Sequence, residues 1–267
     1  VDGAHLFDAS FFSVAAAEAQ ATDPQQRCLL TTAYDCLSGV GYDRHALQDA
    51  KMGVFCALSN HDWQTLAPLR MGVYTGTGVS GAIAANRVSY AFGLQGPSMA
   101  IDTACSSSLS AVNAACLHMR CSSCSEALVA GSEILHGPIA LLVRSAAGML
   151  SPTGRCFTFN ITADGYVRSE GSGAALIAFT ASLEDRAYWP VAEIRGTVMN
   201  QDGKSATLTA PNGPSQAQVI LQTLSDARAE PAEVACSECH GTGTALGDPI
   251  EVGALRGVYG DVSETGT

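Results

Sequence analysis

The sequence predicts an α/β fold in which helices cover buried strands. Short apolar runs of strand length alternate with segments that carry apolar residues at helical spacing. The strand runs are continuously apolar rather than alternating, as expected when both faces of a sheet are covered. The composition, 47% hydrophobic and 15% charged, is that of a well-packed globular chain. Because alanine, glycine and serine are abundant, helices and sheets are expected to pack closely.

The first half of the chain contains most of these signals, punctuated by glycine-rich turns. In chain order we expect a helix over residues 23–37, a strand over 52–58, a loop over 72–81, a helix over 82–92, a turn over 93–97, a strand over 98–102, a long helix from Cys105 onward, and a strand over 126–131.

The second half continues the alternation. Strands are expected over residues 171–180 and 191–199, joined by 183–189, followed by a helix over 215–227 behind Pro214 and a last strand over 234–238. The sequence contains no short-period repeat, linker or low-complexity tract.

Charge and composition exclude several classes of function. The net charge is −11 and the sequence contains no Lys/Arg-rich block, so no nucleic-acid partner is expected. No apolar run reaches the roughly 18 residues of a membrane span. Ten cysteines are scattered without secreted-domain spacing, which favours reduced thiols in an intracellular, cytoplasmic protein, with a plastid as the other compartment considered.

The candidate nucleophile is Cys105, in the run Asp-Thr-Ala-Cys-Ser-Ser-Ser-Leu at residues 102–109. A strand is expected to end here, the chain to turn and a helix to begin. The N–H groups and partial positive charge of a helix N-terminus favour a thiolate and can contribute to an oxyanion site. The alternative is a small buried apolar cysteine.

The second candidate is His240, which opens the run His-Gly-Thr-Gly-Thr-Ala-Leu-Gly-Asp-Pro-Ile-Glu at residues 240–251. It follows an expected strand and lies on a glycine-rich loop with two threonine hydroxyls. Such a loop suits a histidine that meets a reacting carbonyl, although a purely structural loop capped by Asp248 is the alternative. A cysteine and a histidine far apart in sequence favour nucleophilic catalysis.

Together these motifs resemble the beta-ketoacyl synthase family, and specifically the ketosynthase domains of modular, type I-like polyketide synthases. The resemblance covers nearly the whole chain. Its motifs lie, in order, at residues 7–12, 23–27, 85–90, 96–98, 102–109, 148–152, 163–168, 200–203, 209–214 and 240–251.

The resemblance implies a thiolase-like layered fold of two βα halves, with the second half truncated. Residues 1–182 would form the N-terminal half with Cys105, and residues 183–267 the start of the C-terminal half with His240, within one partial ketosynthase domain. In the complete domain we expect a homodimer. Because the sequence begins at Val1 and stops at Thr267 without a closing element, both ends are expected to be cut.

The resemblance also implies a reaction of polyketide, or fatty-acid, biosynthesis. Cys105 would accept an acyl chain from the phosphopantetheine of an acyl carrier protein, and a decarboxylated malonyl-type extender would attack the resulting thioester. His240 would assist decarboxylation, while Thr242, Thr244 and Thr209 would hydrogen-bond the pantetheine arm. The chemistry needs no metal and no other cofactor.

Family members carry a second histidine and a lysine on a Lys-Ser-Asn-Ile-Gly-His-like motif, which does not occur before Thr267, so this piece alone is expected to be inactive. Smaller departures are Ser169 and the Cys-Ser-Glu-Cys run at residues 236–239. A non-elongating ketosynthase or a chain-length or docking partner, which binds acyl chains without condensing them, is the alternative function.

A zinc site is a further alternative, but its two Cys-x-x-Cys pairs are too far apart in sequence for a zinc ribbon. The remaining histidines are expected to lack partners at catalytic or ligand spacing. The zinc pairs are Cys121 with Cys124 and Cys236 with Cys239, and the histidines are His5, His45, His61, His118 and His136.

Overall fold

The structure is a computed structural model that describes residues 3, 5–66, 71–179 and 190–260. The chain divides into two compact units. Unit 1 comprises Val1–Ala140 and Ser169–Val191, and unit 2 comprises Leu141–Arg168 and Ala192–Thr267.

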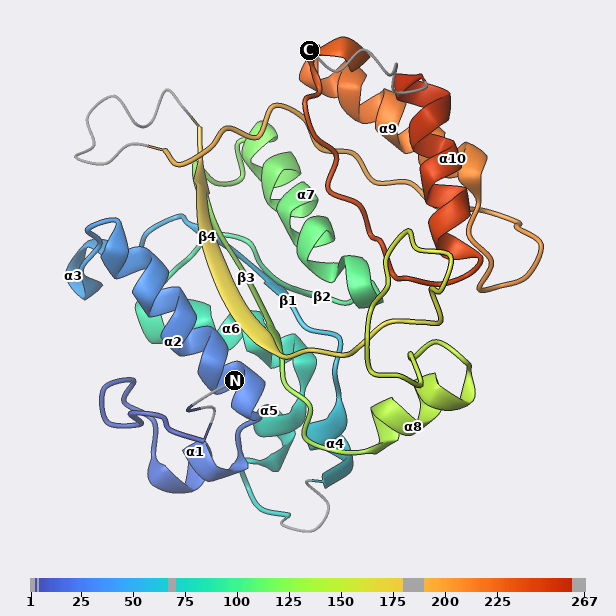
Figure 1. Cartoon of the computed structure of the whole chain (residues 1–267). Helices are drawn as coiled ribbons and strands as arrows, with labels where there is room; N and C mark the ends of the chain where they lie inside the picture. The colour runs from blue at the N-terminus through green and yellow to red at the C-terminus, as the bar shows by residue number, and fades with distance from the viewer. Residues whose placement is uncertain (1–2, 4, 67–70, 180–189, 261–267) are drawn as a thin grey trace. The chain divides into compact units, whose positions relative to one another are not determined.

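Unit 1 is built around a four-stranded sheet with the strand order β2-β1-β3-β4 (Figure 1). The central strand β1 (Gly53–Ala57) runs parallel to β2 (Ser98–Ile101) and to β3 (Glu126–Glu133). The fourth strand, β4 (Gly171–Ala178), runs antiparallel to β3. The three parallel strands therefore direct their carboxyl ends to one edge of the sheet, where open α/β sheets usually hold their sites.

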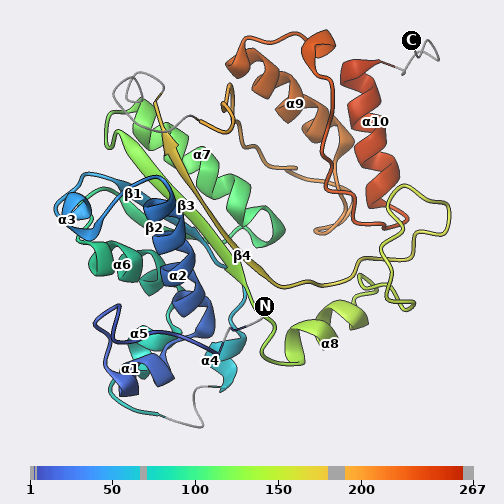
Figure 2. The same cartoon turned by 60° about the vertical axis from the view of Figure 1, so that its left-hand side comes forward.

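Helices cover both faces of this sheet (Figures 1 and 2). The helices α2 (Pro24–Gly39) and α6 (Gly81–Phe92) lie on one face, and α7 (Ser107–Arg120) lies on the other. Covered on both sides, β1 is buried along its whole length, which explains its unbroken apolar sequence.

The side chains of β1 alternate between the two layers. Val54 and Cys56 belong to the core formed with α2 and α6, whereas Phe55 and Ala57 belong to the core formed with α7. In the ladder, Phe55 lies opposite Met99 of β2 and a valine of β3. The strand period of two thus separates one sheet into two apolar cores.

Capping residues set the ends of the major helices. The carboxylate of Asp23 is the N-cap of α2 and accepts the N–H of Gln25 at 2.8 Å, with Pro24 as the first helical residue. The helix α6 ends at Gly93, whose φ of 73° is in the left-handed region. The predicted helices over 23–37 and 82–92, the turn after residue 92 and the four strands of unit 1 are confirmed.

The loop predicted for residues 72–81 was partly wrong, because it contains the short helix α5 (Thr75–Val79). Gly78 in this helix lies against the backbone of Ala21, where an added Cβ would be only 2.3 Å from the carbonyl oxygen. Its own carbonyl accepts the N–H of Asp23 at 2.9 Å. Close packing therefore orders a glycine-rich segment. The other short helices are α1 (Ala16–Ala21), α3 (Arg44–Leu47), α4 (Asp62–Leu66) and α8 (Ile139–Ala146).

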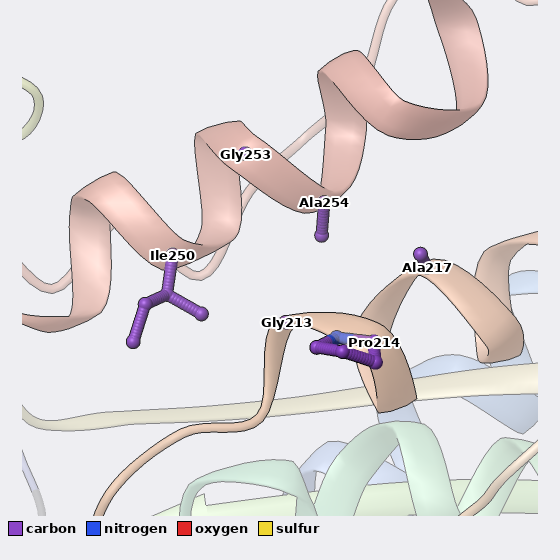
Figure 3. Close-up of a pocket in the computed structure, with 6 residues that line it drawn as sticks. All are labelled: Gly213, Pro214, Ala217, Ile250, Gly253 and Ala254. Atoms are coloured by element: carbon purple, nitrogen blue, oxygen red, sulfur yellow. The ribbon is translucent and has the colours of Figure 1, made fainter.

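Unit 2 contains the helices α9 (Gly213–Ala227) and α10 (Gly247–Tyr259) (Figure 2). The predicted helix over 215–227 is confirmed and is capped by Asn212, whose side chain accepts the N–H of Ser215. An open apolar groove between the two helices carries none of the predicted site residues (Figure 3). Its lining residues are Gly213, Pro214, Ala217, Ile250, Gly253 and Ala254.

The strands predicted over 191–199 and 234–238 were wrong, since the structure assigns no strand to either segment. A strand needs a hydrogen-bonded neighbour, and the first of these segments bonds to a helix instead. The N–H of Thr197 donates to the carboxylate of Asp226 on α9 at 2.9 Å. In the part of unit 2 that the structure describes, strand-like pairing is limited to one bridge between Leu150 and Tyr166. Residues 183–189 lie outside the described part of the chain.

Within the described ranges, no helix has both the length and the apolar character needed to cross a membrane.

Candidate active site

Cys105 is located on a tight turn between strand and helix, as the sequence predicts. β2 ends at Ile101, and Cys105 is the middle residue of the 3-10 helix Ala104–Ser106, which leads directly into α7. Its side chain is exposed. The residue before it, Ala104, has a φ of 54°, a left-handed conformation that is unfavourable for an L-residue with a Cβ. The candidate nucleophile therefore follows a strained backbone position.

Side chains of the same motif hold this turn. The carboxylate of Asp102 accepts the N–H of Ala104 at 3.0 Å. The buried hydroxyl of Ser107 accepts the N–H of Thr103 at 2.9 Å and donates to the carbonyl of Ala104 at 2.7 Å. The hydroxyl of Ser106 donates to the carbonyl of Thr103 at 2.8 Å. In the sequence, the abundance of small residues indicated only close packing and did not show that these hydroxyls fix the turn.

The loops that follow the other parallel strands bring two histidines to the same edge of the sheet. His61 follows β1, and its Nε2 lies 3.3 Å from a carboxylate oxygen of Asp102. His136 follows β3, and its Nε2 lies 3.8 Å from a carboxylate oxygen of Asp23. Sequence spacing gave neither histidine a partner, whereas the structure places each near a carboxylate from a different strand or helix end. Among the described residues, the Nε2 of His136 is buried without a hydrogen-bond partner.

A buried polar network joins the N-terminus of α2 to this edge. The side-chain amide of Gln25 donates to the carbonyl of Asn60 at 3.0 Å and accepts the N–H of Ile134 at 3.3 Å. The side-chain amide of Asn60 donates in turn to the carbonyl of Ile134. Burial raises the pKa of the Asp23 carboxyl beside it. The loops around the Cys105 turn are therefore tied to the helix layer.

His240 is exposed on a loop of unit 2 that a glutamate holds from α10. One carboxylate oxygen of Glu251 accepts the N–H of His240 at 2.6 Å, and the other accepts the N–H of Gly241 at 2.8 Å. Two charge-assisted hydrogen bonds from one side chain fix the backbone on which the imidazole is carried. Glu251 is thus a positioning residue that the motif contained but that sequence reasoning left without a role.

A second carboxylate ties the loop to residues earlier in the chain. Asp248 is buried, and its two oxygens accept the N–H of Gly243 at 2.9 Å and of Phe159 at 2.7 Å. Gly243 has a φ of 68°, and its carbonyl accepts the N–H of Gly165 at 2.9 Å. A Cβ at Gly243 would be 3.0 Å from the carbonyl oxygen of Gly165. Both the backbone conformation and the close approach therefore require glycine at this position.

The predicted threonines differ in their surroundings. The hydroxyls of Thr242 and Thr244 lie 3.1 Å apart, and that of Thr244 also accepts the N–H of Gly247 at 3.1 Å. One of their two hydroxyl protons is used between them, which leaves one to donate to a ligand. Thr209 is exposed in a turn. All three belong to unit 2, as His240 does.

Two further residues contact the carbonyl side of the loop. The hydroxyl of Thr158 donates to the carbonyl of Gly241 at 2.6 Å, and the sulfur of Cys156 lies 3.7 Å from the carbonyl of Thr242. Sequence reasoning missed both. Their only signal is a Cys-Phe-Thr run far upstream of His240, and spacing cannot reveal contact over such a separation.

Cys105 belongs to unit 1, whereas His240, Thr209, Thr242 and Thr244 belong to unit 2. The structure establishes the local geometry of each group. The pairing of Cys105 with His240, and the roles of the threonines, remain predictions.

The cysteines differ in their protonation and exposure. Burial raises the pKa of the Cys56 thiol from 9.0 to about 12. Burial also raises the pKa of the Cys124 thiol. All ten cysteines are among the described residues, and none forms a disulfide. Across the same described residues, no group of three or more histidine, cysteine, aspartate or glutamate side chains is arranged to hold a metal ion.

The fold and the turn place the chain among α/β proteins that present a cysteine where a parallel strand meets a helix. Comparison with known families then identifies the family. Residues 1–181 match the N-terminal domain of beta-ketoacyl synthases, and residues 191–266 match the C-terminal domain. The chain belongs to the beta-ketoacyl synthase family.

Its curated relatives are polyketide synthases. It is 43% identical over 263 residues to the polyketide synthase GfsA of Streptomyces halstedii, covering 97% of this chain and 4% of that protein. It is 42% identical over 257 residues to the pikromycin polyketide synthase component PikAII of Streptomyces venezuelae, covering 95% of this chain and 7% of that protein. The chain thus spans a small part of these relatives.

Solved ketosynthase structures share the fold. The oxazolomycin ketosynthase domain OzmH KS7 of Streptomyces albus JA3453 matches with a TM-score of 0.89 and 38% identity, over 95% of this chain and 44% of that one. The ketosynthase from module 6 of the bacillaene synthase of Bacillus subtilis 168 matches with a TM-score of 0.86 and 34% identity, over 97% and 45%. The predicted thiolase-like α/β class is confirmed, and the chain covers under half of each solved domain.

Proposed function

We propose that this chain is part of a ketosynthase that forms carbon–carbon bonds by decarboxylative Claisen condensation in polyketide biosynthesis. The observation that carries the proposal is the exposed Cys105, on a turn at the start of α7 that side-chain hydrogen bonds hold. The chain also matches both domains of the beta-ketoacyl synthase family. An exposed thiol at a helix N-terminus suits a nucleophile because the helix dipole favours the thiolate.

In the first step, the thiolate of Cys105 attacks the carbonyl of an acyl thioester on the phosphopantetheine arm of an acyl carrier protein. A carbon–sulfur bond to Cys105 forms, the bond to the pantetheine sulfur breaks, and the carrier leaves as a thiol after taking up a proton. Backbone N–H groups at the start of a helix are suited to stabilise the oxyanion of the tetrahedral intermediate.

In the second step, a malonyl-type thioester on a carrier loses carbon dioxide, and the remaining electron pair forms an enolate. Its carbon attacks the acyl-Cys105 carbonyl, giving a beta-ketoacyl thioester and releasing the thiolate, which takes up one proton. His240 donates a hydrogen bond to the enolate oxygen, and Glu251 holds the backbone from which the imidazole extends. No redox change occurs, so metal or redox cofactors are not required.

The threonines would bind the pantetheine arm. The Thr242 and Thr244 pair keeps one hydroxyl proton for an amide carbonyl of that arm, and Thr209 supplies a second hydroxyl from its exposed turn. We further propose that the complete domain is an acyltransferase of the 3-oxoacyl-carrier-protein synthase type, works in the cytoplasm with an acyl carrier protein, and forms a homodimer. The piece from Val1 to Thr267 alone is expected to be inactive.

The test uses the complete ketosynthase domain that contains this chain, with acyl-carrier and malonyl-carrier substrates and mass detection of the products. Cys105→Ala should lose both acyl-enzyme formation and condensation. His240→Ala should still acquire the acyl group but lose condensation. Cys121→Ala, which removes another exposed thiol, should behave as the unchanged protein. Condensation by Cys105→Ala, or an unchanged condensation rate in His240→Ala, would contradict the proposal.

A further inference from the structure

In unit 1, a histidine lies within hydrogen-bonding distance of the aspartate that holds the Cys105 turn. We propose that His61 and Asp102 act as a positioning pair that fixes the reactive orientation of Cys105. The inference rests on the proposed function for the identity of the nucleophile, and it adds two residues from different strand ends to the machinery around it.

The link is a single carboxylate that bonds in two directions. One oxygen of Asp102 accepts the N–H of Ala104, the residue before Cys105, at 3.0 Å. The other oxygen lies 3.3 Å from Nε2 of His61. A donor at the end of β1 is thereby joined, through one side chain, to the backbone that carries the nucleophile at the end of β2.

The joined backbone position needs such support. Ala104 has a φ of 54°, a conformation that persists only where its surroundings enforce it. Asp102 holds the N–H of this residue, and Ser107 holds its carbonyl at 2.7 Å. If the carboxylate of Asp102 can rotate, the hydrogen bond to Ala104 weakens, and Cys105 samples other orientations. His61 restrains that rotation from the far side of the carboxylate.

His61 is itself anchored. The next residue, Asp62, is buried, and its carboxylate accepts the N–H of Gly137 at 3.1 Å, while its own N–H donates to the side chain of Asn60 at 3.0 Å. The imidazole of His61 packs beside Gly81 at the start of α6, with its Cε1 placed 3.6 Å from where a Cβ on that glycine would lie. The backbone beside His61 is therefore held by hydrogen bonds, and its imidazole lies against the start of α6.

The exposure of the pair sets the size of the effect. The side chains of His61 and Asp102 are each 49% exposed, so water competes for their hydrogen bond. Loss of His61 should therefore slow the chemistry of Cys105 rather than abolish it. A hydrogen bond of ordinary net strength corresponds to a change of about threefold to tenfold.

The experiment measures the alkylation rate of Cys105 by iodoacetamide in the complete domain, by peptide mass spectrometry, with the exposed Cys121 as an internal reference. His61→Leu keeps the bulk but removes the donor, and should slow Cys105 about threefold to tenfold relative to Cys121. His61→Gln places an amide donor near the Nε2 position and should restore the rate to within about twofold. The matched control His45→Leu, at an exposed position on α3, should leave the ratio unchanged.

Amide hydrogen exchange at Ala104 gives a second reading that does not depend on thiol chemistry. Exchange should be faster in His61→Leu and return towards the original rate in His61→Gln. The proposal would be overturned if His61→Leu changed neither the alkylation rate of Cys105 nor the exchange of the Ala104 amide. It would also be overturned if His61→Leu and His61→Gln slowed the alkylation of Cys105 equally, because that result indicates a steric role for His61. Normal alkylation without any condensation in the original domain would instead count against the proposed function and leave the pairing intact.

Discussion

The Cys105 turn and the His240 loop are supported in different ways. The turn extends from a sheet whose two faces are packed with apolar side chains from α2, α6 and α7. Among the described residues of unit 2, few are buried, namely Gly165, Leu224, Gly243, Asp248 and Ala254. Three of them, Gly165, Gly243 and Asp248, belong to the hydrogen-bond system of the His240 loop.

The difference teaches which interactions each group depends on. Apolar burial is non-directional and tolerates small shifts, whereas hydrogen bonds to carboxylates define single positions and fail when one acceptor is removed. Substitutions in the apolar core should therefore reduce the stability of unit 1 as a whole. Substitutions at Asp248 should instead release the His240 loop.

The largest expected effect is a core truncation. Leu128 of β3 is fully buried against the α2 and α6 layer, and Leu128→Ala should lower the free energy of unfolding by about 2–5 kcal/mol. Leu221→Ala on α9, where the side chain is 52% exposed, should lower it by about 0.5 kcal/mol. Urea unfolding of the two variants measures the contrast. Equal losses of the free energy of unfolding in the two variants would contradict the stated dependence of unit 1 on apolar burial.

Asp248→Asn should have the next largest effect, confined to unit 2. The amide keeps one acceptor for two N–H donors, so one of the bonds to Gly243 or Phe159 is lost, at a cost of about 1–3 kcal/mol. Hydrogen exchange should accelerate at the amide that loses its acceptor. Asp164→Asn, a matched change at an exposed aspartate, should leave exchange at both amides unchanged. Equal protection in Asp248→Asn would show that other contacts hold the loop.

Cys56 on β1 gives the core of unit 1 a pH-dependent contribution to stability. Because burial raises the pKa of the Cys56 thiol to about 12, its contribution to stability is complete below the unfolded value of 9.0 and is lost as the pH rises from there towards 12. The stability advantage over Cys56→Ala should therefore shrink between about pH 8 and pH 11. The matched control Val54→Ala, which removes a buried side chain of the same strand that cannot titrate, should show no such trend. A constant difference for Cys56 would contradict its assigned burial.

The smallest expected effect is at Asp23. Asparagine serves as an N-cap about as well as aspartate, so Asp23→Asn should change stability at pH 7 by less than about 1 kcal/mol. Burial raises the pKa of Asp23, so the original protein should lose stability relative to Asp23→Asn as the pH rises through the range above about 4. Chemical denaturation between about pH 3 and pH 7 measures this difference. A trend of opposite sign would mean that hydrogen bonds outweigh burial.

Much of unit 1 could be predicted because its signals are local. The continuous apolar run of β1 and the capped start of α2 at Asp23 are visible in a few consecutive residues. The strand–turn–helix setting of Cys105 was equally local. The segments 191–199 and 234–238 have the same local signal, yet the structure assigns them no strand, because a strand depends on neighbours that its own sequence does not specify.

The site contacts that were missed join distant parts of the chain. His61 and Asp102 are 41 residues apart and meet because β1 and β2 are parallel neighbours. Phe159 and Asp248 are 89 residues apart. Sequence spacing cannot show such pairs until the strand order and the loop paths are known.

The most direct test of the central claim is to locate the acyl group on the protein. The complete domain is incubated with a short-chain acyl thioester, digested without reduction, and mapped by mass spectrometry. The account predicts acylation of Cys105 ahead of the other exposed cysteines, Cys121, Cys156 and Cys236, and no adduct at position 105 in Cys105→Ala. Acylation spread evenly over the exposed thiols, or absent from Cys105, would contradict the assignment of Cys105 as the nucleophile.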